Sequence, residues 1–204
     1  TQLEDALLAR ADLLVVYGGE RVARELGQRG HTRVVVHGPK LSIGIVRGTA
    51  VASDEVVQSA ARAIATFDQQ GCVSPHAIYI ITDDPADARA FARALSSALA
   101  QVEAELPRGR ITTEDAVAIN TARTEAEFKS IAGAQVELFS SPTATIVWQG
   151  EAGFRASCLG RFAYVASVPA IDRMIELLRP HGQILQSIAI EGFQKDEAAE
   201  RLPN

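Results

Sequence analysis

The residues best suited to chemistry in this sequence lie in the stretch FDQQGCVSPH, residues 67–76, around Cys72. An amphipathic helix is expected before this stretch and an apolar strand after it, so a tight Gly-Cys-Val-Ser-Pro turn would fix the sulfur at the edge of a sheet. A thiolate held in this way is a nucleophile that can carry an acyl group as a thioester. The alternative is that Cys72 is a small buried apolar residue, as free cysteines usually are. Cys158, the only other cysteine, is expected to be inert.

Activation of Cys72 would require a hydrogen bond, a histidine or a cation nearby. A helix amino terminus lowers the pKa of a thiol. Cys72, however, is expected to follow the carboxyl terminus of a helix that stops at Gly71, where the helix dipole acts in the opposite direction. His37 and His76 are the candidates for activation, and the alternative for His76 is a plain surface histidine in a turn.

Two glycine turns indicate a place for a phosphate-bearing ligand. Gly18 and Gly19 join an apolar strand to a helix, where the backbone can approach a ligand and the helix amino terminus favours an anion. The full dinucleotide fingerprint is absent, so a plain tight turn is the alternative. Gly38 lies in a His-Gly-Pro-Lys turn, in which Lys40 could meet a phosphate or carboxylate or remain a solvated lysine.

The elements that would position these residues alternate between strands and helices. Strands are expected at residues 13–17, 33–37, 42–46, 77–82, 136–139, 143–148, 162–167 and 184–190, the first two of them buried. Helices are expected at residues 3–10, 20–30, 55–70 (capped by Asp54), 85–105, 113–131 and 170–178. The order strand, glycine turn, helix, strand is a βαβ unit with parallel strands. The sequence therefore predicts an α/β fold, a three-layer domain with a mostly parallel sheet.

The composition argues against several classes of protein. The 204 residues are 47% hydrophobic and 22% charged, which is ordinary for a globular domain. The net charge is −5 and there is no basic stripe, so a nucleic acid partner is not expected. No apolar run approaches the roughly 20 residues of a membrane span. Two cysteines are too few for a disulfide framework or a zinc site, and the aspartates at 83, 84 and 87 stand where helix caps belong. A reducing, cytoplasmic setting and no metal are predicted.

Taken together, four stretches resemble one family. HGPKLSIGIV, then FDQQGCVSPHAIYI about thirty residues later, then LGRFAYV and ILQSIAI are similar to a LuxC-type acyl-CoA reductase. This is the fatty-acyl reductase branch of the aldehyde dehydrogenase superfamily, and FDQQGC-x-SP is the most specific of the motifs. The resemblance implies a fold like the aldehyde dehydrogenase catalytic domain. It also implies NADPH or NADH as cofactor, and reduction of an acyl thioester, from acyl-CoA or an acyl-carrier protein, to a fatty aldehyde.

The resemblance assigns roles to particular residues. The acylated cysteine of the family corresponds to Cys72, Gly18–Gly19 to the segment beside the cofactor phosphates, and Gly38 to the turn that passes close to the nicotinamide. Hydrolytic relatives have a glutamate that activates water two residues before a Gly-Gly-Lys segment. Setting that segment against residues 38–40 places Val36 at the glutamate position, which implies an acyl-enzyme that water attacks slowly.

The resemblance also implies a longer polypeptide. Residues 1–34 would be the trailing βα part of a nucleotide-binding region and residues 35–204 the catalytic cysteine domain, or the two would form one continuous domain. This segment alone is then expected to be inactive. A homo-oligomer is expected, because reductases of the superfamily commonly associate through a sheet edge. Two alternatives remain: another reductase of the superfamily acting on a short acyl-CoA or an acyl phosphate, and a non-catalytic α/β scaffold with a buried cysteine.

Overall fold

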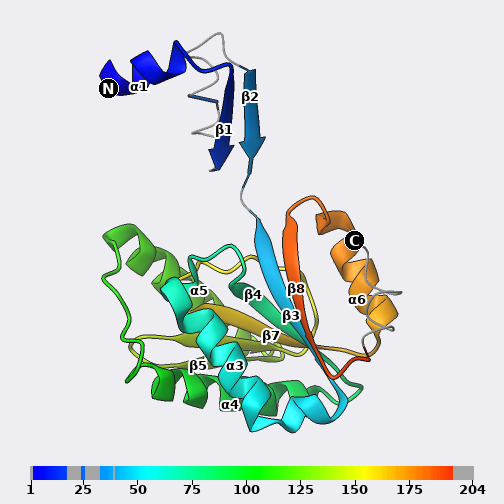
Figure 1. Cartoon of the computed structure of the whole chain (residues 1–204). Coiled ribbons are helices and arrows are strands. Elements are labelled where there is room, and N and C mark those ends of the chain that lie inside the picture. The colour runs from blue at the N-terminus through cyan, green and yellow to red at the C-terminus, as the bar shows by residue number, and fades with distance from the viewer. Residues whose placement is uncertain (1, 18–23, 26–32, 39, 195–204) are drawn as a thin grey trace. The chain divides into compact units, whose positions relative to one another are not determined.

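The computed structural model describes residues 2–17, 24–25, 33–38 and 40–194, shown in Figure 1. The chain divides into two compact units, Thr1–Lys40 and Leu41–Asn204. The division after Lys40 lies a few residues beyond the boundary expected after residue 34. The nucleotide-binding role expected for the first unit stays a prediction.

The first unit contains helix α1 (Gln2–Leu8) and strands β1 (Leu13–Tyr17) and β2 (Arg33–His37). The two strands pair in parallel, from Leu13↔Arg33 to Tyr17↔His37, as the βαβ pattern predicts. Residues 24 and 25 are helical, and the rest of the helix expected at 20–30 lies outside the described residues. The prediction that both strands are buried is wrong for the described residues: of the two strands only Val16 is buried.

The second unit is built on a six-stranded sheet in the order β5-β6-β7-β4-β3-β8. Every neighbouring pair is parallel except β5 and β6, so the sheet is mostly parallel, as predicted. The strands are β3 (Leu41–Arg47), β4 (Pro75–Ile81), β5 (Val136–Ser140), β6 (Thr145–Gln149), β7 (Phe162–Val168) and β8 (Leu185–Glu191).

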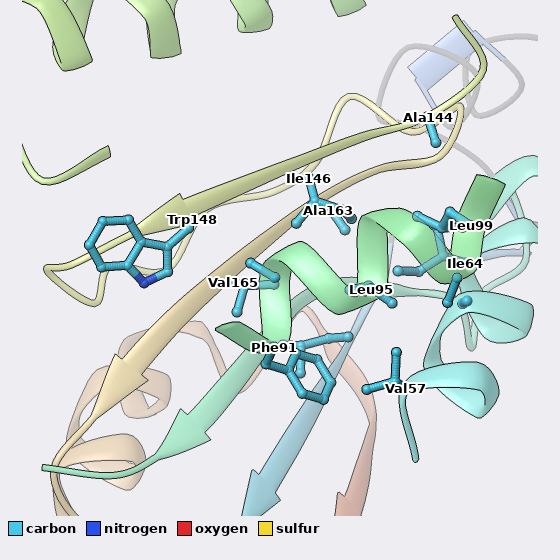
Figure 2. Close-up of a cluster of buried hydrophobic side chains, with 14 of the residues drawn as sticks. Val57, Ile64, Phe91, Leu95, Leu99, Ala144, Ile146, Trp148, Ala163 and Val165 are labelled. Carbon is cyan, nitrogen blue, oxygen red and sulfur yellow. The ribbon is translucent and has the colours of Figure 1, made fainter. Parts of the chain in front are cut away.

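Helices cover both faces of this sheet and make the predicted three layers. They are α3 (Asp54–Ala65), α4 (Pro85–Val102), α5 (Thr113–Ile131) and α6 (Ile171–Leu178), with short 3-10 turns at Gly48–Ala52, Thr66–Gln69 and Arg179–His181. On one face Ile64, Phe91 and Leu95 of α3 and α4 pack against Ile146 and Val165 of the sheet (Figure 2). On the other face apolar residues of α5 and α6 pack against Ala77, Tyr79 and Val168. Strands buried on both faces explain the nearly continuous apolar runs at residues 77–81 and 162–168.

The expected helix at 55–70 differs from the observed one at both ends. Its cap is Ser53, whose hydroxyl accepts a hydrogen bond from the Val56 N–H at 3.4 Å, and not Asp54. The α-helix ends at Ala65, because Phe67, Asp68 and Gln69 adopt left-handed backbone angles, with φ of 52°, 50° and 67°. Gly71 is therefore not the residue that stops this helix.

Asp84 caps α4 by accepting a hydrogen bond from the Ala86 N–H at 2.8 Å, in keeping with the predicted role of the aspartates. In the part of the chain that the structure describes, no helix has the length and apolar character needed to cross a membrane.

Candidate active site

Cys72 lies in a four-residue turn that leads directly into the amino end of β4. The turn is closed by a hydrogen bond from the Ser74 N–H to the Gly71 carbonyl at 3.0 Å. Cys72 is exposed, so the buried cysteine assumed by the scaffold alternative is not observed. The α-helix ends at Ala65, and a helix dipole acts only within the last turn, so the opposing effect expected on the thiol is removed.

Two serines hold the backbone of Cys72 from neighbouring strands. The Ser42 hydroxyl, at the start of β3, donates a hydrogen bond to the Cys72 carbonyl at 2.7 Å. The Ser42 and Ser187 oxygens lie 2.7 Å apart. Because a hydroxyl carries one hydrogen and that of Ser42 is directed at Cys72, Ser187 of β8 must be the donor to Ser42. The amino ends of β3, β4 and β8 are thereby joined at the cysteine.

The buried amide of Gln69 spans the residues on either side of the turn. Its side chain is completely buried, at 0% exposure. The Nε2 group donates to the Pro75 carbonyl at 2.8 Å, and Oε1 accepts from the Phe162 N–H at 2.9 Å. Gln69 therefore ties the two ends of the Cys72 turn to each other and to β7.

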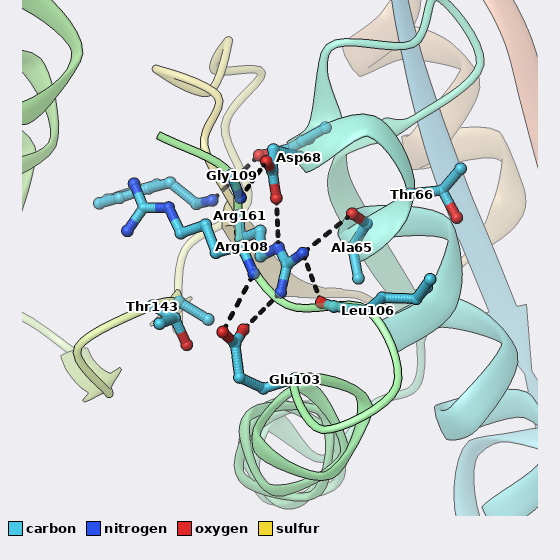
Figure 3. A network of polar contacts seen from close by, with 12 residues as sticks. Ala65, Thr66, Asp68, Glu103, Leu106, Arg108, Gly109, Thr143 and Arg161 are labelled. Atoms are coloured by element: carbon cyan, nitrogen blue, oxygen red, sulfur yellow. Dashed lines mark hydrogen bonds and ion pairs between the residues drawn. The ribbon is translucent and has the colours of Figure 1, made fainter. Parts of the chain in front are cut away.

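A buried arginine holds the residue before Gln69, as Figure 3 shows. The side chain of Arg161 is 2% exposed. Its guanidinium donates to the Asp68 carboxylate at 2.7 Å, to the Glu103 carboxylate at 2.6 Å and to the carbonyls of Leu106 and Ala65 at 2.8 and 3.4 Å. Because a buried charge is costly unless paired and hydrogen-bonded, this arrangement fixes the end of α3 against the loop that precedes β7.

His76 is buried on β4 and is not the surface histidine of the alternative interpretation. Its Nδ1 accepts a hydrogen bond from the Ser157 N–H at 3.1 Å. Burial lowers the pKa of His76, and the hydrogen bond from Ser157 opposes this only in part. The imidazole is therefore uncharged at neutral pH and supplies no positive charge to Cys72. Its role in activation stays a prediction.

Cys158 differs from Cys72 in its surroundings. It is half-buried, and burial raises the pKa of its thiol even though Arg108, Arg123 and Arg155 act in the opposite direction. A raised pKa leaves less of the reactive thiolate at neutral pH. This environment supports the expectation that Cys158 is inert.

The remaining candidates belong to the first unit. The carboxyl ends of β1 and β2 carry Tyr17 and His37, whose rings stack with centroids 4.8 Å apart. Gly38 follows β2 and is half-buried, whereas Gly18 and Gly19 lie outside the described residues. Within the described part of the chain, no group of three or more His, Cys, Asp or Glu side chains could hold a metal ion.

A cavity of about 600 Å³ lies away from the cysteine, lined by residues that include Lys129, Gln149, Phe154 and Arg155. It is at the carboxyl end of β6, whereas Cys72 precedes the amino end of β4. Strand β7 lies between these two strands and is parallel to both, so the cavity and Cys72 are at opposite edges of the sheet. The residues that line the cavity include no cysteine, so the thioester chemistry predicted for Cys72 has no counterpart there.

The fold defines a class of protein. The structure resembles a methylmalonate-semialdehyde dehydrogenase from Sinorhizobium meliloti 1021 (TM-score 0.69, 12% identity, 97% of this chain, 44% of the other). It also resembles betaine aldehyde dehydrogenase from Staphylococcus aureus (0.64, 13%, 91% and 45%). A third neighbour is aldehyde dehydrogenase 21 from Physcomitrella patens (0.64, 12%, 91% and 46%). The chain thus has an aldehyde dehydrogenase fold and spans less than half the length of these proteins.

The sequence then gives the family within this class. The family model for acyl-CoA reductase (LuxC) matches residues 1–203, and the chain belongs to this family. A sequence search of curated proteins finds no match. The predicted resemblance and fold class are confirmed.

Proposed function

We propose that the protein reduces an acyl thioester, carried by coenzyme A or an acyl-carrier protein, to an aldehyde through an S-acyl intermediate on Cys72. The observation that carries this proposal is an exposed cysteine on a backbone held by the buried side chains of Ser42 and Gln69. Family membership supports the same chemistry. A scaffold would need no such support beneath an exposed thiol.

The first step is attack of the Cys72 thiolate on the acyl carbonyl, followed by departure of the donor thiol, which takes up a proton. The attack places negative charge on the carbonyl oxygen. Among the described residues, the N–H groups of Cys72 and Val73 have no hydrogen-bond partner. Both N–H groups belong to the turn that carries the sulfur and are suited to donate to the developing oxyanion.

The first unit fits a nicotinamide cofactor, NADPH or NADH, in its general construction. Ligands of open α/β sheets bind beyond the carboxyl ends of parallel strands, and β1 and β2 end side by side before Gly18–Gly19 and Gly38. When bound, the cofactor would supply the hydride that reduces the acyl carbon. The carbonyl then re-forms as the carbon–sulfur bond breaks, so that Cys72 would leave as the thiolate and the product would be released as free aldehyde.

Two exposed apolar side chains favour an acyl chain over an acyl phosphate as substrate. Phe67 is 80% exposed and Val73 is 67% exposed, on either side of Cys72. The phenyl ring of Phe67 lies near Gly71. An apolar chain would bury these side chains on binding, whereas a phosphate would gain nothing from them. A short acyl-CoA remains the second candidate substrate.

The test is acyl transfer by the full-length protein under reducing conditions. These conditions match the cytoplasmic setting that we propose for it. Labelled acyl-CoA without nicotinamide should leave label on the wild-type protein and on Cys158→Ala, but not on Cys72→Ala. Label retained by Cys72→Ala would move the nucleophile elsewhere. Full-length protein is required because the chain spans less than half the length of its structural neighbours, and we expect residues 1–204 alone to turn over acyl-CoA poorly.

A further inference from the structure

We propose that Gln69 is a positioning residue whose side-chain amide sets how the Cys72 thiol is presented to the acyl group. This inference rests on the proposed function of Cys72. Gln69 lies three residues before Cys72, and Pro75, which accepts its hydrogen bond, lies three residues after it. The amide therefore closes the base of the loop that has the cysteine at its tip.

The amide acts where the sheet ladder has ended. The pairing between β4 and β7 begins at Ala77↔Tyr164, so Pro75 and Phe162 each lie two residues before the first paired residue of their strand. Gln69 donates to the Pro75 carbonyl and accepts from the Phe162 N–H, as a peptide group inserted between the two strands would do. A side-chain amide has the donor and the acceptor of a peptide group, so Gln69 provides hydrogen bonds to the Pro75 carbonyl and the Phe162 N–H where the pairing of the strands has ended.

The backbone of Gln69 is in a conformation that its side-chain contacts must maintain. Its φ of 67° is in the left-handed region, which is unfavourable for a residue other than glycine, asparagine or aspartate. Two hydrogen bonds to buried groups, and the contact of Oε1 with the Ser157 hydroxyl at 3.4 Å, hold it there. Loss of the amide would release Gln70–Ser74 from both strands and leave the Ser42 hydroxyl as the tie on Cys72.

The substitution Gln69→Glu distinguishes the two hydrogen bonds of the side chain, because it removes one of them and keeps the other. A carboxylate keeps the acceptor for the Phe162 N–H but faces the Pro75 carbonyl with a second acceptor, so the bond across the Cys72 loop is lost. A protonated carboxyl group restores the donor, and burial raises the pKa of such a group. The rate of Cys72 acylation in Gln69→Glu, divided by the wild-type rate, should therefore fall as the pH rises.

The experiment measures single-turnover acylation by labelled acyl-CoA in the full-length protein, with KM, kcat and the thermal midpoint for each variant. Because small misplacements of reacting groups cost up to about 10²-fold, we expect Gln69→Glu at high pH to acylate about 10- to 100-fold more slowly, with KM little changed. Gln69→Asn, which tolerates the left-handed backbone but is one methylene too short, should be slowed similarly without the added pH dependence. If Gln69→Glu does not fold, the acylation rate of Gln69→Asn tests the inference in its place.

The matched control is Gln70→Glu, which adds the same charge at the exposed neighbouring glutamine. Its acylation rate should stay within about twofold of wild type, because an exposed charge is screened by solvent. The ionisable neighbours Asp68, His76 and Arg161 are the same in all variants. A pH-independent rate ratio for Gln69→Glu, an equal effect of Gln70→Glu, or wild-type acylation by Gln69→Asn would overturn the inference. Label that remains on Cys72→Ala would instead overturn the proposed function.

Discussion

Arg161→Met is the change that tests how far the buried ion-pair network stabilises the second unit. Methionine has a similar length and the same left-handed backbone cost, so the comparison isolates the guanidinium. The substitution removes hydrogen bonds to Asp68, Glu103 and the carbonyls of Ala65 and Leu106. Breaking a buried ion pair by removing one partner costs about 3–5 kcal/mol.

The two carboxylates decide where in this range the cost falls. The side chains of Asp68 and Glu103 are 22% and 29% exposed, so water can partly replace the arginine and the lower end, about 3 kcal/mol, is expected. For a protein of this size, about 3 kcal/mol lowers the melting temperature by roughly 6–12 °C.

Urea unfolding followed by circular dichroism measures the free energy of unfolding, and a thermal scan gives the midpoint. The matched control is Arg62→Met, which removes the exposed ion pair with Glu105 and should cost at most about 1 kcal/mol. If Arg161→Met is as stable as Arg62→Met, the network does not stabilise the fold as argued.

Three further predictions concern the site. The pKa of His76 is lowered in the folded protein. When the pH is lowered through about 6.5, the usual pKa of histidine, the unfolded state therefore binds more protons than the folded state, and the free energy of unfolding should decrease. The substitution His76→Asn keeps an acceptor for the Ser157 N–H and removes the titrating group, so the urea midpoint of this variant should decrease less on acidification than that of the wild type. An equal decrease in both proteins would contradict the prediction. Iodoacetamide should modify exposed Cys72 faster than half-buried Cys158, as peptide mass spectrometry would show, and equal rates would count against the assignment. Val36→Glu should speed acid release from the acyl-enzyme without NADPH, by up to the roughly 10²–10⁴-fold of general-base assistance. The 43% exposure of Val36 spares the carboxylate a large burial cost, and no change in acid release would refute the alignment.

The fold could be predicted largely because its elements are marked by local signals. The helix expected at 113–131 was found at those residues, where Thr112 and Asp115 form a capping box at its start. The apolar runs at residues 77–82 and 162–167 became central strands. The end of α3 was missed, because Asp68 and Gln69 leave the helix to bind Arg161 and Phe162, which lie about ninety residues further along the chain.

The site could be predicted only in part, for the same reason. Gly71 and Pro75 mark a turn, so the place of Cys72 in a turn before a strand could be predicted from local residues. The sequence left open whether this cysteine is buried, and the structure shows that it is exposed. The supports beneath the turn join residues far apart in sequence, such as Ser42 and Ser187, and nothing local distinguishes either serine from a solvated one. Of the two adjacent glutamines only Gln69 is buried, a difference set by the left-handed turn and not by residue type.

Backbone strain in the described residues is concentrated in two segments that contact each other, one of which leads into the Cys72 turn. The non-glycine residues with positive φ form two groups, Phe67–Gln69 and Leu159–Arg161, the second interrupted by Gly160. The two groups bind each other through the Gly160 N–H and the Asp68 carbonyl, 3.1 Å apart, and through the Arg161 and Asp68 side chains. Each such residue costs about 1–3 kcal/mol and persists only where its surroundings hold it. A buried arginine and a buried glutamine supply these contacts, so the cost is met by groups that also fix the cysteine loop. If Cys72 acts as we propose, the contacts that maintain the unfavourable backbone also hold the loop that presents its thiol to the acyl group.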